Sequence, residues 1–193
     1  MKTTYFDSRA MQTRIARFKS IPSQKNDALA KHGIPVEAME MIAAKDIMYY
    51  LGPKNSVAGA SGGTAPAVDG QPGLSVYVVK CPPGQGPMLH AHQRTHETFF
   101  CLDGRWEVRW NDDGSDSAIL EPYDMIAVPV NVSRAFRNVS EREAHLLVMI
   151  QGDPNDMTDV AYAPAVGAEL VNRHGPQAKA GFEKIGVTFD AGV

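Results

Sequence analysis

The chain has 193 residues, of which 44% are hydrophobic and 21% charged, a composition that indicates one globular domain with extensions. A formal net charge of −3 argues against nucleic-acid binding, and the longest apolar runs are too short to cross a bilayer, so no membrane span is expected. The N-terminus lacks the apolar core of a secretory signal, and two cysteines are too few for a disulfide framework. We therefore expect reduced thiols and a cytoplasmic location.

Helices are expected in the first quarter of the chain. Asp7 or Ser8 can cap the first helix, and Ser23 can cap a second that ends before Gly33. A third can begin at Pro35, because proline suits the first helical turn. We interpret these helices as packing elements.

A Gly- and Pro-rich loop is expected over residues 55–73, where the sequence is small and nearly uncharged. Such a segment can be a simple connector. Because long loops in compact domains are often functional, a lid over a pocket is an alternative.

Short alternating segments separated by turn residues follow, and they are typical of a small β-sandwich or barrel. Asn111–Gly114 (NDDG) is expected to form a hairpin turn. After residue 152 we expect a mostly irregular tail with one short helix near Ala165–Asn172. The expected strands are 74–80, 87–92, 97–102, 106–111, 117–120, 124–130, 133–138 and 144–151.

Residues 90–97 contain a candidate metal site. His90 and His92 are two residues apart, so on a strand both side chains face the same way. Glu97 follows closely enough to return on a neighbouring strand and face the same point. Two imidazoles and a carboxylate form a credible site for a divalent metal.

The spacing around these residues resembles the first motif of the cupins: Gly, five residues, His-x-His, three or four residues, Glu, six residues, Gly. Gly84, His90, His92, Glu97 and Gly104 fit it throughout.

The resemblance implies an all-β core formed by a small cupin or jelly-roll β-barrel over residues 74–151, with the motif side chains in its mouth. Residues 1–54 would then be a helical N-terminal extension, 55–73 the loop, and 152–193 a C-terminal extension.

The second cupin motif is only partly present. Pro129 and Asn138 match it, whereas Tyr123, Asn131 and Arg134 stand where the family has Gly, Gly and His. Asn tolerates the left-handed backbone that such a turn requires of Gly. The change to Arg134 is more serious, because that His is the family's usual fourth metal ligand, and a protonated guanidinium cannot bind a metal.

In a first interpretation, His90, His92 and Glu97 hold the metal unaided and leave coordination positions open. Arg134 would then anchor an anionic small-molecule substrate, such as a carboxylate or enol, for oxygenase- or isomerase-like chemistry. Ligand type does not choose among iron, manganese, nickel, zinc and copper.

In a second interpretation, the protein is a metal-free small-molecule-binding module in which Arg134 pairs directly with Glu97. In a third, His96 restores a fourth ligand, although strand alternation points it away from Glu97. Cys101 shares the parity of Glu97 and should face the interior, as an inert core residue or a thiolate ligand.

Aromatic side chains are expected to line the pocket by the same alternation: Phe99, Phe136 and either Trp106 or Trp110. A homodimer is also expected, formed through edge strands or by exchange of the helical N-terminal arm.

Overall fold

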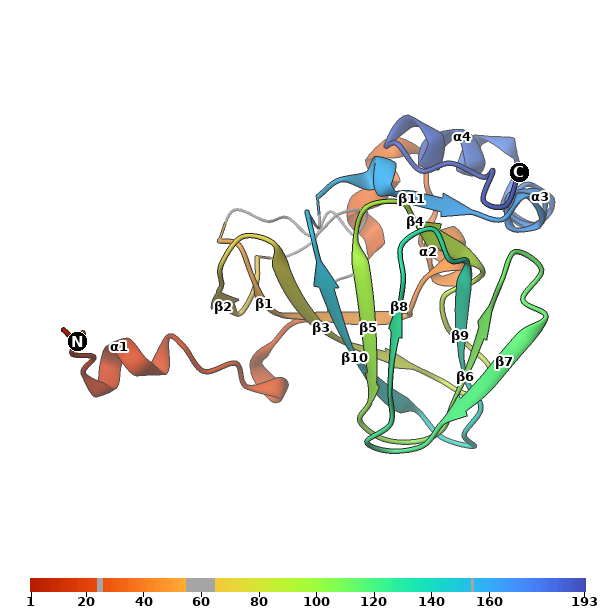
Figure 1. Ribbon diagram of the computed structural model, residues 1–193. Helices are drawn as coiled ribbons and strands as arrows, with labels where there is room; N and C mark the ends of the chain where they lie inside the picture. Colours follow the sequence, from red (N-terminus) through yellow and green to blue (C-terminus); the bar gives the residue numbers. More distant parts are fainter. Residues whose placement is uncertain (24–25, 55–64, 154) are drawn as a thin grey trace.

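The computed structural model describes residues 1–23, 26–54, 65–153 and 155–193, and the strands of the central part of the chain form two β-sheets (Figure 1). The larger sheet has the strand order β2-β1-β3-β10-β5-β8 and the smaller one β11-β4-β9-β6-β7. The strands are β1 (Asp46–Gly52), β2 (Val68–Asp69), β3 (Leu74–Cys81), β4 (His90–His92), β5 (His96–Cys101), β6 (Trp106–Trp110), β7 (Asp116–Leu120), β8 (Met125–Val128), β9 (Arg134–Asn138), β10 (Ala144–Gln151) and β11 (Val160–Tyr162).

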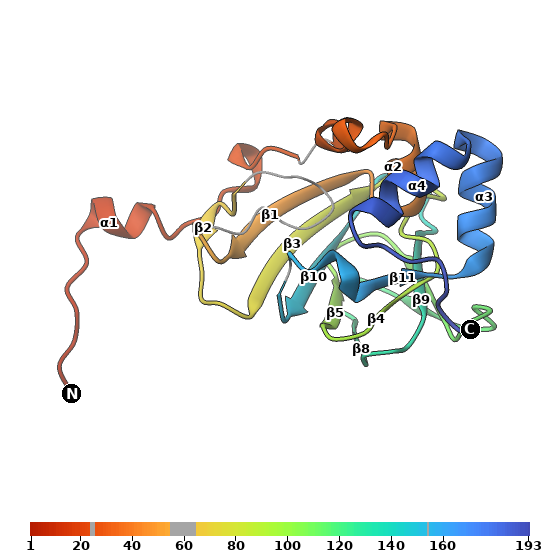
Figure 2. The same ribbon diagram turned by 90° about the horizontal axis from the view of Figure 1, so that it is seen from above.

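The helices lie before and after the strand-rich region. The α-helices are α1 (Ser8–Gln12), α2 (Val36–Ile42), α3 (Pro164–His174) and α4 (Pro176–Lys184), and the 3-10 helices are η1 (Phe18–Ser20), η2 (Asn26–His32) and η4 (Met157–Asp159). Figure 2 shows α2, α3 and α4 gathered on one side of the sheets, whereas α1 extends away from the body. None of the helices in the described ranges is long and apolar enough to cross a membrane.

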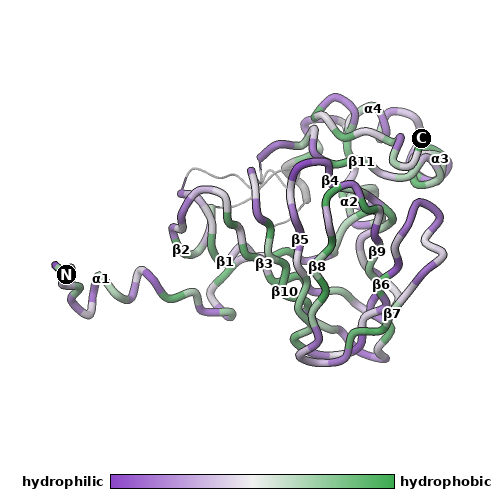
Figure 3. Tube along the Cα trace, viewed as in Figure 1, coloured by the Kyte–Doolittle hydropathy of each residue, from purple (hydrophilic) through white to green (hydrophobic). Residues whose placement is uncertain are grey.

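The main core forms because alternate side chains of the strands point between the two sheets. On β5, Glu97, Phe99 and Cys101 are buried, while His96 at the start of the strand is exposed. The hydrophobic stretches of β3 and β10 stand out in Figure 3. The largest buried members of this core are Tyr49, Tyr77, Phe99, Trp106, Phe136 and Leu146.

A second hydrophobic cluster joins the two extensions of the chain. Ile34, Met39 and Ile42 of the N-terminal part pack with Leu170 and Phe182 of the C-terminal helices. Residues on either side of the strand-rich region therefore form one cover at the end of the sheets where β4 and β11 lie (Figures 1 and 2).

The expected fold class is confirmed, and each of the eight expected strand segments contains a strand. Asp7 caps α1 by accepting a hydrogen bond from the backbone N–H of Ala10 (2.7 Å), and α2 starts directly after Pro35.

Three parts of the chain differ from the expectation. Val68–Asp69, placed in the 55–73 loop, form the short strand β2, which pairs in parallel with β1. Residues 46–52, placed in the helical extension, form β1, which pairs antiparallel with β3. The C-terminal tail contains α4 and β11 besides the expected helix, because burial of Leu170 and Phe182 in the second cluster stabilises helices too short to persist alone. Residues 55–64 of the expected loop or lid lie outside the described residues.

The backbone keeps the turn geometry of the resembled motif even where glycine is replaced. Tyr123 and Asn131 have φ angles of 78° and 61°, in the left-handed region that favours glycine. Asn131 tolerates this region, as expected, whereas Tyr123 occupies it as an exposed side chain of a turn.

Candidate metal centre

Two strands bring the predicted ligands together. β4 presents His90 and His92, and β5 presents Glu97, with all three side chains buried. β9 pairs with β4 so that Arg134 lies directly opposite His90. β11 covers the other edge of β4, with Tyr162 opposite His90.

His90, His92 and Glu97 each offer one ligand atom, and these atoms all lie within 4.8 Å of one another. His92 Nε2 is 3.5 Å from Glu97 Oε1. The strand alternation and spacing therefore do bring the three candidate ligands to one point.

Hydrogen bonds fix which nitrogen of each imidazole faces this point. His90 Nδ1 lies 2.7 Å from the carbonyl oxygen of Met88, which can only accept, so Nδ1 carries the hydrogen. His92 Nδ1 lies 2.7 Å from Oδ2 of Asp159 and donates to it in the same way. Nε2 of His90 is left with a free lone pair, the state that metal binding requires, and Nε2 of His92 is the ring nitrogen that faces Glu97.

Asp159 is a part of the site that the sequence analysis missed. This buried carboxylate lies in η4, and it also accepts hydrogen bonds from the Thr95 hydroxyl (2.5 Å) and the backbone N–H of Arg94 (2.5 Å). Burial raises the pKa of Asp159, but the hydrogen bonds from His92, Thr95 and Arg94 outweigh it and hold the pKa well below the usual range. Asp159 is therefore an ionised acceptor that orients His92.

Arg134 is committed to protein partners. Its Nη2 and Nε donate to Glu97 Oε2 at 2.6 and 3.2 Å, and its Nη1 donates to the carbonyl oxygen of Val132 at 3.3 Å. The side chain is 1% exposed. This pairing occupies Oε2 of Glu97 and leaves Oε1 on the side of His92.

The surroundings of the site keep Glu97 and His90 in the protonation states that a metal needs. Burial raises the pKa of Glu97, but His92 and Arg134 outweigh burial and lower it to about 2. Burial, followed by the Arg134 charge, lowers the pKa of His90 to about 3. At neutral pH the site therefore holds a carboxylate and a neutral His90 imidazole.

The other candidate residues lie away from the three ligands. His96 is exposed on the opposite face of β5. Cys101 is buried and its thiol donates toward the carbonyl oxygens of Asp103 and Gly104, while burial raises its pKa to about 11. A thiolate ligand would require the opposite shift.

The predicted aromatic wall is mainly core packing. The rings of Phe99 and Phe136 have centroids 3.9 Å apart in the main core. Trp106 is fully buried there, and Trp110 is partly buried against it. Tyr162, which no sequence signal singled out, is the aromatic residue beside His90, at a ring distance of 5.4 Å.

A cavity of about 110 Å³ adjoins the two imidazoles. Its lining residues are Met39, Ile42, His90, His92, Met157, Val160, Tyr162, Phe182 and Val187. Most of them come from the two extensions of the chain.

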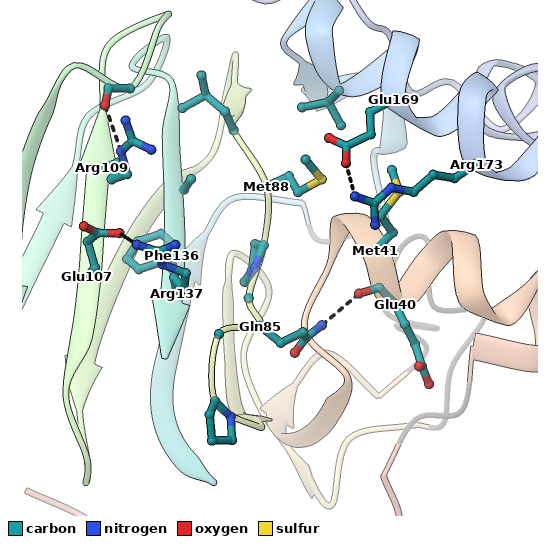
Figure 4. Close-up of a pocket in the computed structure, with 18 of the residues that line it drawn as sticks. Glu40, Met41, Gln85, Met88, Glu107, Arg109, Phe136, Arg137, Glu169 and Arg173 are labelled. Carbon is teal, nitrogen blue, oxygen red and sulfur yellow. Dashed lines mark hydrogen bonds and ion pairs between the residues drawn. The ribbon is translucent and has the colours of Figure 1, made fainter. Parts of the chain in front are cut away.

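A larger cavity of about 640 Å³ lies elsewhere, between the outer faces of β6 and β9 and the helices α2 and α3 (Figure 4). All three of its arginines already have partners. Arg137 pairs with Glu107 at 2.7 Å and Arg173 with Glu169 at 2.5 Å, and Arg109 Nε donates to the carbonyl oxygen of Gly114 at 2.9 Å. Because none of the three candidate ligands lines it, size alone does not make it the site of the chemistry.

A comparison with protein-family models agrees with this architecture. Residues 77–150 match the family model described as "Cupin domain". No curated protein sequence matches the chain. Similar solved structures include TT1209 from Thermus thermophilus, with 25% identity over 41% of this chain and 72% of that one, at a TM-score of 0.38.

Two further solved structures are similar over comparable stretches. KdgF from Halomonas sp. is 20% identical over 42% of this chain and 71% of its own, with a TM-score of 0.39. A structure of the DMSP lyases RdDddP and RnDddQII is 20% identical over 55% of this chain, at a TM-score of 0.43, and this chain spans only 47% of that one. The matched region, the strand topology and the His-x-His and Glu spacing together place residues 77–150 in the cupin superfamily, as a cupin domain.

Proposed function

We propose that this protein binds a divalent transition metal through His90 Nε2, His92 Nε2 and Glu97 Oε1, and that it is an enzyme of oxygenase- or isomerase-like type. The observation that carries the proposal is the pair of fixed imidazoles. Two buried rings each donate Nδ1–H to an acceptor, and their free nitrogens converge with a carboxylate oxygen. A bound metal would supply Lewis-acid activation of a substrate oxygen.

Charge supports a small carboxylate or enol-type substrate. Glu97 and Arg134 neutralise each other, so a divalent ion in the site would retain its two positive charges. A buried excess of positive charge favours an anionic group at the open coordination positions. Anchoring of that group by Arg134 itself stays a prediction, and it would require the guanidinium to leave a present partner.

The buried ion pair also favours a second candidate, a metal-free cupin that binds a small molecule without catalysis. Arg134 and Glu97 form a neutral, hydrogen-bonded pair by themselves, so the positive charge usually supplied by a metal is already present in the protein.

Metal analysis of untagged protein separates the two candidates. After dialysis and reconstitution with iron, manganese, nickel, zinc or copper, we expect about one equivalent of one metal in the unaltered protein. H90A, H92A and E97Q should each abolish stoichiometric binding. H96A is the matched control, because His96 is an exposed histidine on the opposite face of the same strand region, and it should keep the metal.

Less than a small fraction of an equivalent after every reconstitution would contradict the metal proposal. Metal gained only in R134H would favour the metal-free candidate. If the metal is present, oxygen uptake with small carboxylates distinguishes an oxygenase from an isomerase.

A further inference from the structure

The cavity of about 110 Å³ beside His90 and His92 has one polar end and an apolar body. α2 contributes Met39 and Ile42 to its wall. The C-terminal extension contributes five side chains: Met157, Val160, Tyr162, Phe182 and Val187. Apart from His90 and His92, the residues that line it belong to the two extensions and lie outside the matched cupin region.

Among the described residues, His90 and His92 are the only ionisable side chains besides the Tyr162 phenol that line this cavity, and no Asp, Glu, Lys or Arg does so. The Tyr162 hydroxyl lies 3.4 Å from the carbonyl oxygen of Ile42, to which it donates, so it is directed at a backbone partner. The remaining lining side chains are Met, Ile, Val and Phe. A second charged or strongly hydrated group placed among them would lose its water without gaining a partner, which costs several kcal/mol.

The volume limits what can enter. A hydrocarbon-lined cavity of roughly 150 Å³ is large enough for benzene, so about 110 Å³ admits a body of roughly four or five non-hydrogen atoms. Met39 and Met157 are flexible side chains that can adapt to a short unbranched or branched chain.

We propose that the substrate is a short aliphatic monocarboxylate, or its enol, whose uncharged body of about three to four carbon atoms fills this cavity. Its head group lies at the imidazole end. The position of the head rests on the proposed metal function, whereas the class of the body rests on the cavity alone. Dicarboxylates, sugar acids and aromatic acids are excluded by charge, polarity or size.

Methyl NMR tests this proposal without an activity assay. In protein labelled with ¹³C at the methionine methyl groups, butyrate should shift the Met39 and Met157 resonances in a saturable manner. Acetate should bind more weakly, because each buried methylene contributes about 0.8 kcal/mol, a roughly fourfold change in affinity. Octanoate and succinate should leave both resonances unchanged. Equal binding of succinate, or shifts confined to other methionines, would overturn the assignment.

V187F provides a variant that fills the cavity, because Val187 is a buried lining residue. It should raise the dissociation constant of butyrate at least tenfold. V139F is the matched control, since the same change falls on an exposed residue outside the cavity. The length series in the unaltered protein keeps the test decisive if V187F does not fold.

The metal content of the same samples separates the two proposals. If the protein binds no metal but butyrate still shifts the Met39 and Met157 resonances, the lack of metal refutes the proposed metal function and the shifts support the cavity assignment. If the protein binds one equivalent of metal but butyrate shifts neither Met39 nor Met157, the metal function is supported and the cavity assignment is refuted.

Discussion

His92 is oriented by one residue that is distant in sequence and by one near neighbour. Thr95 stands three positions after it, whereas Asp159 comes from beyond the cupin region. Because the Asp159 carboxylate is buried and ionised, it holds the Nδ1 hydrogen of His92 and so leaves Nε2 as the ligand atom. A cupin strand alone would supply the imidazole but would leave the ring free to rotate or to take the other tautomer.

Replacing the Asp159 carboxylate should therefore weaken metal binding. In D159N, we expect metal affinity to fall about 10- to 100-fold, as is usual when the hydrogen-bond acceptor of a ligating histidine is lost. Competition with a chelator measures the affinity, and ¹⁵N chemical shifts of His92 report its tautomer. D156N is the control, because Asp156 is a nearby carboxylate that pairs with Arg94 at 2.7 Å without contacting a ligand. Equal affinities in the two variants, with an unchanged tautomer, would contradict the role of Asp159.

At the scale of elements, the strands were predictable because alternate residues of a strand face the core, so apolar residues recur at every second position. The segment ETFFC predicts its own inward face, and Glu97, Phe99 and Cys101 are indeed buried. β11 and α4 were not predictable in this way. β11 has only three residues, too few to show a period, and its pairing partner His90–His92 lies about seventy positions earlier.

The contacts of the candidate site likewise fall into those that local spacing predicts and those that it does not. The three candidate ligands lie within eight residues, so local spacing was enough to group them. The Glu97–Arg134 pair was predicted as one of the alternatives, because the motif gives the register of β9. The contact between His92 and Asp159 depends on how the C-terminal extension folds back, which no local pattern encodes.

The packing of this extension should make a large contribution to stability. Leu170 of α3 is completely buried in the second cluster. In L170A, we expect the free energy of unfolding to fall by about 2–5 kcal/mol, through lost burial and the cavity left behind. Urea denaturation measures the change. R173A, on the exposed side of the same helix, should cost less than about 1 kcal/mol, because it removes only a surface ion pair. A loss in L170A no larger than that in R173A would show that the extension does not fold cooperatively with the sheets.

At the scale of the whole molecule, the N-terminal arm (residues 1–20) contrasts with the rest of the chain. α1 contributes no buried residue, and Tyr5, Phe6, Met11 and Ile15 are all exposed. The arm carries five basic and one acidic side chain, whereas the remainder of the chain has an excess of acidic ones. An exposed apolar segment with this charge is suited to an acidic, apolar surface of a second copy.

The edge strand β8 offers such a surface. Tyr123 and Met125 are 78% and 60% exposed, and Glu121 and Asp124 lie beside them. β8 ends the larger sheet, so its outer edge has no neighbouring strand among the described residues. We therefore expect a homodimer in which the arm of each copy covers β8 of the other.

Sedimentation velocity tests this arrangement. Deleting residues 1–16 should convert the dimer to a monomer and leave the free energy of unfolding of the monomer nearly unchanged, because α1 buries nothing within its own chain. Phe18 is retained, since its ring packs edge-on against His145.

The double variant R9E/R14E should weaken the dimer without shortening the chain. The unaltered dimer should also weaken as the salt concentration is raised, because attraction between exposed charges is screened. M125K places a positive charge on the surface that is expected to receive the basic arm, and it should weaken the dimer as strongly as R9E/R14E does. If the protein without residues 1–16 is still a dimer, the contact between the copies is formed by strand edges alone. If the full-length protein is a monomer, the arm does not bind a second copy.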